Sequence, residues 1–203
     1  DVKEFLSELL KQLKSIDYIK PEDIPNIDLY MDQVTTFMDE QLAASKRYES
    51  DKILTKTMIN NYAKNNLLPS PDKKKYSKEH VLTLLFIYYF KNILSINDIR
   101  SILNPLTEKY FGNDDGFTMQ DVYTEVFGLE AEESQKLLKD LGKKYKIAGE
   151  TFEDFPAEDQ KFLHTFSFIC MLSFDVYIKK MLIERMIDDL NEEKEASKKT
   201  GSN

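Results

Sequence analysis

The sequence predicts a mainly α-helical protein, with a helical head that carries a small β wing at most and a C-terminal helical bundle. Glycine and proline, which interrupt helices, occur only six times each among 203 residues. Hydrophobic residues make up 41% of the chain, which is enough to bury a core without disulfides or metals. They recur at helical spacing in several segments, and this pattern indicates amphipathic helices rather than strands.

Charge is distributed unevenly along the chain. The net charge is −8, which argues against a general affinity for nucleic acid. Residues 52–91 nevertheless hold eight lysines and only two carboxylates, so this stretch is a basic island in an acidic chain. Such an island can mark a surface that binds phosphate, or it can simply keep a small domain soluble. Charge alone leaves both interpretations open.

Cysteine content and hydropathy bear on the cellular location. Cys170 is the one cysteine, so no internal disulfide can form and a reducing cytoplasm is the expected location. No N-terminal segment has a basic start followed by an apolar run, so no secretory signal is predicted. The most apolar window, 162–174, is too short for a bilayer span and is interrupted by His164, so no membrane association is expected.

Two helices are predicted before the basic island. Apolar residues at helical spacing predict an amphipathic helix over 2–16, and prolines then indicate a connecting loop over 17–26. Asp28 is the predicted N-cap of the next helix, whose apolar positions run from Leu29 to Leu42. The polar segment 48–51 ends it.

A short helix over 55–64 is the first candidate functional element. Thr55 is a good N-cap, and Ile59, Tyr62 and Ala63 form the face that we expect to turn inward. Lysine reaches phosphates or guanine and asparagine can bond adenine, so the opposite face suits the DNA major groove. Any solvated helix face also carries such residues. The outward residues are Lys56, Thr57, Asn60, Asn61 and Lys64.

The second candidate element is the basic segment Lys73-Lys74-Lys75-Tyr76, which holds the densest positive charge in the chain. Next to a recognition helix, it is a plausible wing for the phosphate backbone or the minor groove. Ser77 is then predicted to cap a helix that runs to about Lys91. Ser95 is predicted to cap another, with Asp98 completing a capping box.

These motifs together resemble the DNA-binding head of MerR-type regulators, a winged helix-turn-helix. The resemblance rests on Thr57-Met-Ile-Asn-Asn-Tyr62, Leu67-Leu68-x-Pro, Lys74-x-Tyr76 and Leu94-Ser-Ile-x-Asp-Ile99. It implies a recognition helix that contains Lys56, Asn60 and Asn61, a wing of Lys73, Lys74 and Lys75, and a phosphate contact from Tyr76. Asn66 stands where these regulators have the glycine that ends the recognition helix.

A longer stretch, from IDLYMDQVTTFMDEQL through LTKTMINNYAKNNLLPSPDKKKYSKEH, resembles the YkrK-like domain of unknown function of low-GC bacteria. That family has no established activity, so this resemblance supports the fold more than the function. The expected division is an N-terminal helix and linker over 1–26, the head over 27–104, a C-terminal helical region over 105–195 and a disordered tail over 196–203.

The second half is predicted to be helical. Residues 111–117 form a turn that lacks the acidic ligands of a calcium loop. Thr118 with Asp121 starts a short helix to about Phe127, and a second helix covers 130–144. After a loop bounded by Gly149 and Pro156, a long helix covers 157–191. Its first part, to residue 174, is apolar nearly all round and is expected to be the central core helix. Its amphipathic end could form a homodimer or pack within the chain.

An enzyme is not expected, and neither is a bound metal or cofactor. Two histidines, His80 and His164, and one cysteine are too few for a metal site or a Cys–His nucleophile, and no Gly-rich phosphate loop occurs. The leading hypothesis is a transcription regulator that binds double-stranded DNA through 55–64 and the wing at 73–76. The alternative is a non-enzymatic helical module for protein interaction or ligand sensing that keeps the winged-helix shape without binding DNA.

Overall fold

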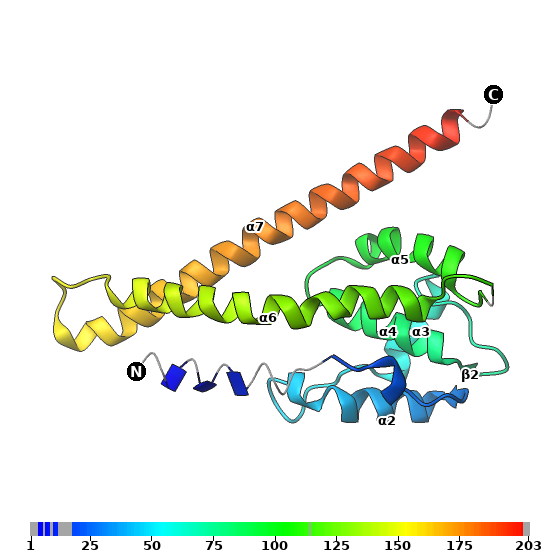
Figure 1. Ribbon diagram of the computed structural model, residues 1–203, viewed down its shortest axis with the longest axis horizontal. Helices are drawn as coiled ribbons and strands as arrows, with labels where there is room; N and C mark the ends of the chain where they lie inside the picture. The colour runs from blue at the N-terminus through cyan, green and yellow to red at the C-terminus, as the bar shows by residue number, and fades with distance from the viewer. Residues whose placement is uncertain (1–3, 6, 9, 12–17, 114, 201–203) are drawn as a thin grey trace. The chain divides into compact units, whose positions relative to one another are not determined.

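The computed structural model describes residues 4–5, 7–8, 10–11, 18–113 and 115–200 (Figure 1). The described chain is mainly helical, as predicted, and it holds a two-stranded sheet. It divides into two compact units. We call Ile16–Gly128 with Ile187–Asn203 the head unit, and Asp1–Ser15 with Leu129–Met186 the hairpin unit. The predicted helix over 2–16 lies mostly outside the described residues.

The head unit is built from short helices around a minimal sheet. Strand β1 pairs antiparallel with β2, with Leu29 opposite Tyr76 and Tyr30 opposite Lys75. The end of α7 and the start of α6 also belong to this unit. The elements are η1 (Pro21–Asp23), β1 (Leu29–Tyr30), α2 (Met31–Gln41), η2 (Ala43–Ser45), α3 (Lys56–Lys64), β2 (Lys75–Tyr76), α4 (Lys78–Phe90), α5 (Ile96–Tyr110), α6 (Met119–Gly149) and α7 (Ala157–Thr200).

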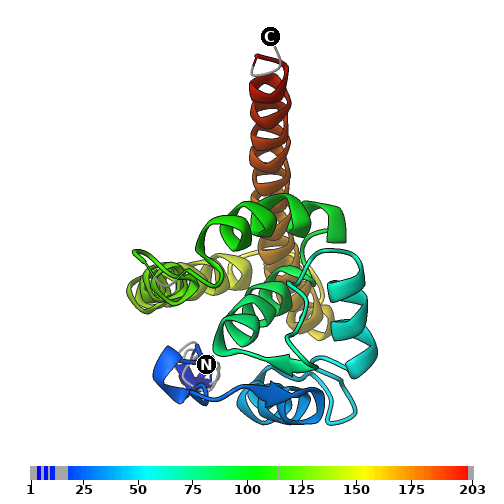
Figure 2. The ribbon, with the colours of Figure 1, turned by 90° about the vertical axis from the view of Figure 1, so that its right-hand side faces the viewer.

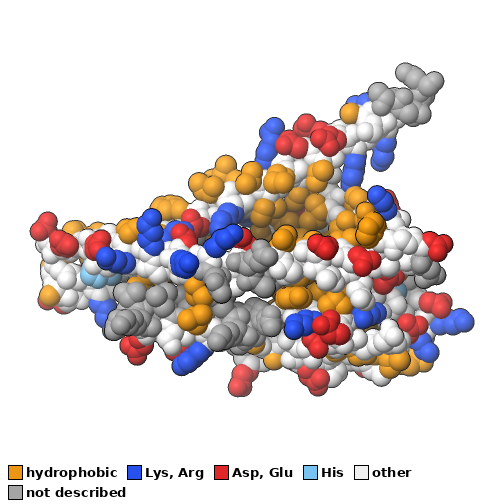
Figure 3. Space-filling view, in the orientation of Figure 1, with side chains coloured by type: hydrophobic (Ala, Val, Ile, Leu, Met, Phe, Trp, Pro, Cys, Tyr) orange, Lys and Arg blue, Asp and Glu red, His pale blue; other side chains and the backbone are white. Residues whose placement is uncertain are grey.

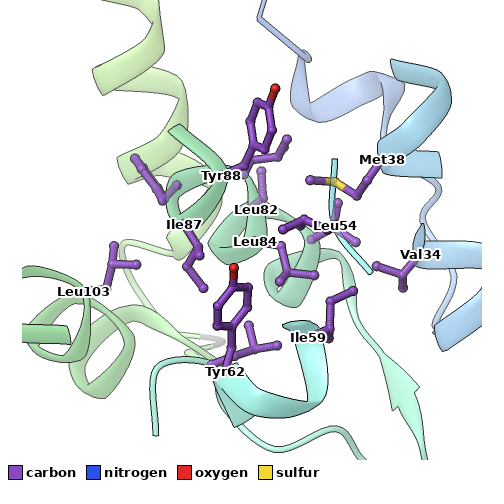
Figure 4. Close-up of a cluster of buried hydrophobic side chains, with 14 of the residues drawn as sticks. Val34, Met38, Leu54, Ile59, Tyr62, Leu82, Leu84, Ile87, Tyr88 and Leu103 are labelled. Carbon is purple, nitrogen blue, oxygen red and sulfur yellow. The ribbon is translucent and has the colours of Figure 1, made fainter. Parts of the chain in front are cut away.

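Helix α4 is the centre of the head unit. Its residues from His80 to Tyr88 are all buried, so the helix is covered on every side. Figure 4 shows side chains of α2, α3, α4 and α5 meeting in one cluster, with Val34 and Met38 on α2 and Ile59 on α3. A helix that is apolar all round is stable only in such a position. The core thereby fixes α3 against α2 and α4.

Local capping signals in the sequence are confirmed. The Thr55 hydroxyl accepts a hydrogen bond from the Met58 N–H at 3.2 Å and starts α3. Ser77 caps α4, and Ser95 caps α5 with Asp98 as the reciprocal partner. Side-chain oxygens at these positions satisfy N–H groups that have no partner within the helix.

The end of α3 is a Schellman motif with asparagine in the place usual for glycine. The Leu67 N–H bonds the Tyr62 carbonyl at 2.9 Å, and the Asn66 N–H bonds the Ala63 carbonyl at 3.2 Å. Asn66 has φ of +54°, a left-handed conformation that asparagine tolerates better than most residues. The turn sends Leu67 and Leu68 into the core.

Replacing Asn66 with alanine should therefore lower the free energy of unfolding by about 1 kcal/mol, because Cβ disfavours a left-handed backbone. Asn66→Gly should be neutral or slightly stabilising. Chemical denaturation followed by circular dichroism would measure both variants. Equal effects of alanine and glycine would contradict the assignment of strain to this position.

Two predicted helix boundaries are wrong. Asp28 does not cap α2, because Leu29–Tyr30 is extended and pairs with β2. The N-cap is Tyr30 instead, and its N–H donates to Gln33 Oε1 at 2.8 Å. The helices predicted to end at about Phe127 and to cover 130–144 are one continuous helix, α6. The predicted cap at Thr118 is correct, since its N–H and hydroxyl both bond Asp121 at 2.8 Å.

The hairpin unit contains the later part of α6 and most of α7, joined by the loop that the sequence placed between Gly149 and Pro156. Phe5 stacks on Tyr145 at 4.2 Å, and Phe168 meets both rings edge-on. Lys144 on α6 forms ion pairs with Asp140 and with Asp175 on α7. These contacts hold the two helices together.

The prediction that residues 157–174 form a buried core helix is wrong. Phe162 is 70% exposed and Phe174 is 66% exposed, although both lie in the most apolar window of the sequence. Helix α7 also continues to Thr200, so residues 196–200, expected in a disordered tail, are helical. Residues 201–203 lie outside the described part of the chain.

Candidate nucleic-acid interface

Helix α3 presents the predicted polar face. Ile59 and Tyr62 are buried and form the side of the helix that packs on the core. The helix contains no acidic residue. Nine residues give a length of about 13 Å, comparable to the width of the DNA major groove. All five predicted residues of this helix are exposed on the other side, namely Lys56, Thr57, Asn60, Asn61 and Lys64.

The basic segment forms a tight two-residue turn, which we call the basic turn (Asp72–Lys75). The Lys75 N–H donates to the Asp72 carbonyl at 2.8 Å, and these two residues form an antiparallel bridge. Lys73 and Lys74 occupy the tip with φ of +45° and +65°, the pattern of a type I′ turn. Both side chains are exposed. Lysine in a left-handed conformation costs about 1 kcal/mol per residue, so this turn carries charge at some expense of stability.

Lys75 and Tyr76 have different environments from the two lysines at the tip. Lys75 is half-buried, with Nζ 5.4 Å from the centre of the Tyr30 ring. Tyr76 is 3% exposed and packs edge-on against His80, and burial raises the pKa of its hydroxyl. The resemblance suggested a phosphate contact for Tyr76, but the residue belongs to the core beneath the turn. We therefore leave it out of the candidate interface.

His80 anchors the segment that leads into the basic turn. Its Nδ1 accepts the Ser77 N–H at 2.9 Å, which leaves Nε2 protonated and donating to the Ser70 carbonyl at 3.3 Å. The ring also meets Phe111 edge-on at 4.7 Å. Burial lowers the pKa of His80, while its bonds to backbone carbonyls act in the opposite direction. These contacts give His80 a structural role.

The N-terminus of α2 connects the α3 face to the basic turn. Lys56 on α3 forms an ion pair with Asp32, while Lys75 of the turn lies over Tyr30. Tyr30 and Asp32 are only two residues apart, so they bring the two predicted elements to one place. Figures 1 and 2 show α2, α3 and β2 side by side. Neither connecting residue is distinguished by the sequence around it, because each acts only through partners distant in sequence.

Carboxylates on α2 reduce the positive charge of this surface. Asp32 pairs with Lys56, and Asp39 and Glu40 line a 480 Å³ cleft that Lys52 and Lys56 also line. Lys64, Lys73 and Lys74 are the exposed lysines of the face and turn that have no acidic partner among the described residues.

Lys91, counted in the basic island of the sequence, has a structural role instead. Its Nζ donates to the Ile53 carbonyl at 2.9 Å, and burial lowers its pKa.

Among the described residues, no group of three or more histidine, cysteine, aspartate or glutamate side chains is arranged to hold a metal ion. Within the same part of the chain, no helix combines the length and apolar character that crossing a membrane requires.

Comparison with known proteins gives one match. Residues 19–126 match a protein family described as a domain of unknown function (DUF1836), and the match covers just over half of the chain. The α3 face, the basic turn and the start of α2 all lie inside it. No curated protein and no solved structure matches the chain.

Proposed function

The chain belongs to the DUF1836 family, and from its α3 face and basic turn we propose that it is a DNA-binding regulator of transcription without enzymatic activity. In this proposal α3 enters the major groove, and the basic turn contacts the phosphate backbone beside it. The head is then a winged helix-turn-helix similar to that of MerR-type regulators.

The observation that carries the proposal is that α3 and the basic turn both contact the start of α2. Lys56 and Lys75 both contact the first residues of α2, so the start of α3 and the base of the turn are neighbours. Asn60 and Asn61 lie exposed on the same side of α3 and can bond adenine edges. Lysines at both elements would bind phosphates flanking that contact.

The proposal predicts how strongly DNA affinity depends on salt concentration. With Lys64, Lys73 and Lys74 each on one phosphate, the slope of log affinity against log salt is about −2.7. Affinity then falls about 40-fold between 50 mM and 200 mM salt. This is a modest slope, in keeping with the acidic character of the rest of the chain.

The test is a paired substitution that removes charge without weakening the turn. Lys73→Asn with Lys74→Gly places preferred residues in a type I′ turn, so the fold should become slightly more stable. DNA affinity at 50 mM salt should nevertheless fall, and the salt slope should become shallower by about 1.8. Fluorescence anisotropy with duplex DNA from the gene's own upstream region measures both quantities.

The matched control is Lys179→Gln with Lys180→Gln on α7, which removes the same charge from exposed positions of the other unit. It should leave affinity and slope unchanged. The proposal fails if the wild-type chain binds no DNA at 50 mM salt, or if both double variants change binding equally.

The Asp32–Lys56 ion pair favours a second candidate, a protein-interaction or ligand-sensing module that does not bind DNA. A carboxylate beside the first lysine of α3 repels phosphate. Asp32→Asn separates the two functions, because a DNA-binding protein should gain affinity when Lys56 is released. A module that does not bind DNA should show no binding with either residue at position 32.

A further inference from the structure

A cleft of about 450 Å³ lies in the head unit, between α5 and the end of α7. This volume is within the usual range for sites that bind small molecules. The Lys194 Nζ on α7 donates to the Ser101 carbonyl on α5 at 3.0 Å and so ties the two walls together. Ile187, one turn before the cleft, is 3% exposed and anchors this end of α7 in the core. The cleft is therefore part of one compact unit.

Arg100 on the α5 wall has a donor without a partner. Its Nε is buried and bonds no atom of the described chain, whereas its Nη1 donates to Asn97 Oδ1 at 3.3 Å. A buried N–H of a charged group without an acceptor costs stability, so it indicates an acceptor from outside the chain. Guanidinium groups bind two oxygens of a phosphate or carboxylate at once. Because Arg100 also lines the cleft, a turn of its side chain directs Nε and Nη2 toward an anion there.

Lysines of α7 supply positive charge from the other wall. Asn191, Lys194 and Lys198 follow one another at three and four residues, so they share one side of the helix and line the cleft. Figure 3 shows carboxylates as well as basic side chains along this end of α7. The three glutamates within 192–195 fall at other helical positions and do not line the cleft. The Lys194 ammonium has three donors, of which the bond to Ser101 uses one, so it can still bind an anion.

The polar lining indicates what the anion carries. Arg100 precedes Ser101, which holds the Lys194 ammonium, so the two cations stand at the same end of the cleft. Asn104 and Glu108 follow one and two turns further along the same face of α5. An amide and a carboxylate bond neutral hydroxyl groups, and the carboxylate repels a second phosphate. The lining residues, all within the described chain, include no aromatic side chain to stack on a nucleobase.

We propose that this cleft binds a sugar phosphate. The phosphate lies between Arg100 and Lys194, with Lys198 adding a third positive charge, and the sugar hydroxyls bond Asn104 and Glu108. The lining thus holds three cations and one carboxylate, in a chain with a net charge of −8. The proposal does not rest on DNA binding, because none of these residues belongs to α3 or to the basic turn.

The first test measures binding of glucose 6-phosphate to the full chain, by titration calorimetry at 50 mM salt and by thermal unfolding. A dissociation constant of about 1 mM is expected, so 10 mM ligand should raise the unfolding midpoint by about 4 °C. Inorganic phosphate should bind about 10-fold more weakly, because it lacks the hydroxyls that reach Asn104 and Glu108. Glucose should leave the midpoint unchanged. No binding of glucose 6-phosphate, or affinity equal to that of inorganic phosphate, would overturn the proposal.

Charge removal on the α5 wall gives the second test. Arg100→Gln should weaken glucose 6-phosphate binding about 10-fold or more, because the paired donors for the phosphate are lost. The substitution leaves the bond between Lys194 and Ser101 in place, and circular dichroism should remain helical. The matched control is Lys199→Gln, which removes the same charge from an exposed lysine of α7 outside the cleft and should leave affinity unchanged. Equal losses in the two variants would contradict a site in the cleft.

Glu108→Ala gives a result that a loss of folding cannot imitate. Removing the carboxylate should strengthen binding of inorganic phosphate about 2-fold and abolish most of the preference for glucose 6-phosphate. Arg100→Gln should leave the affinity for duplex DNA unchanged. If it weakens DNA binding and leaves glucose 6-phosphate binding intact, the cleft contacts the DNA backbone and the proposal is wrong. If the chain binds no DNA, the regulator proposal fails while this one stands.

Discussion

Replacing His80 with alanine should lower the free energy of unfolding by about 3 kcal/mol at pH 7.5. The variant loses the ring that packs against Tyr76 and Phe111, and it leaves a cavity beside α4. It also removes the acceptor for the Ser77 N–H and the donor for the Ser70 carbonyl. Urea denaturation followed by circular dichroism measures the loss. A loss below about 1 kcal/mol would show that the segment before the basic turn is held by other contacts.

The same residue should make stability depend on pH. Burial lowers the pKa of His80 below its usual 6.5. Above pH 6.5 the ring is therefore neutral in both the folded and the unfolded chain, and its contribution to the free energy of unfolding is fully present. As the pH falls below 6.5, the unfolded chain binds a proton that the folded chain does not, and stability declines toward the folded-state pKa. The midpoint of thermal unfolding should therefore fall between pH 7.5 and pH 5.5.

His80→Gln is the control for this pH dependence. Its amide can accept from the Ser77 N–H and donate to the Ser70 carbonyl, but it cannot titrate in this range. The variant should be less stable at pH 7.5 and lose less stability on acidification. If His80→Gln and the wild-type chain lose equal stability over this range, His80 does not cause the acid sensitivity.

Replacing Pro105 with alanine should raise the free energy of unfolding by about 2 kcal/mol. Pro105 lies within α5 and has no N–H, so the carbonyl of Ser101, four residues earlier, lacks its usual helical donor. Lys194 on α7 provides a replacement, with Nζ donating to the Ser101 carbonyl at 3.0 Å. The proline thus leaves the Ser101 carbonyl of α5 without a helical donor, and Lys194 near the end of α7 donates to it.

A double-mutant cycle tests this relation directly. Lys194→Met should cost about 1 kcal/mol in the wild-type chain, because it removes the donor while keeping the aliphatic stem. In the Pro105→Ala background the same substitution should cost almost nothing, because the alanine N–H then bonds the carbonyl. Additive effects of the two substitutions in urea denaturation would contradict the idea that both act on Ser101.

Much of the head unit could be predicted because its signals are local. Thr55, Ser77 and Ser95 each cap a helix by bonding a backbone N–H three residues away, so the sequence alone contains both partners. Asn66 was identified at the position of a glycine, and its left-handed backbone follows from that position. The exposed face of α3 follows from helical spacing alone.

The incorrect predictions concern partners that are distant in sequence. Asp28 was predicted to cap a helix that begins at Leu29. Leu29 instead belongs to β1, which pairs with β2, and the residues of β2 lie more than forty positions later in the sequence. That pairing also buries Tyr76, which local composition placed in an exposed wing. The role of Asp32 as the partner of Lys56 could not be read from either segment alone. Residues 162–174 were identified correctly as apolar, but apolar character alone does not determine burial, and Phe162 and Phe174 are exposed.

At the tip of the basic turn, the residues that would stabilise the backbone differ from the residues that carry positive charge. Asparagine and glycine at positions 73 and 74 would relieve the left-handed backbone, whereas lysine at both positions keeps it strained. Selection for stability alone would replace these lysines readily, because a single substitution at either site is an improvement. On the proposed function, family members that bind DNA should keep basic residues at these two turn positions, and asparagine and glycine should occur there in members that do not.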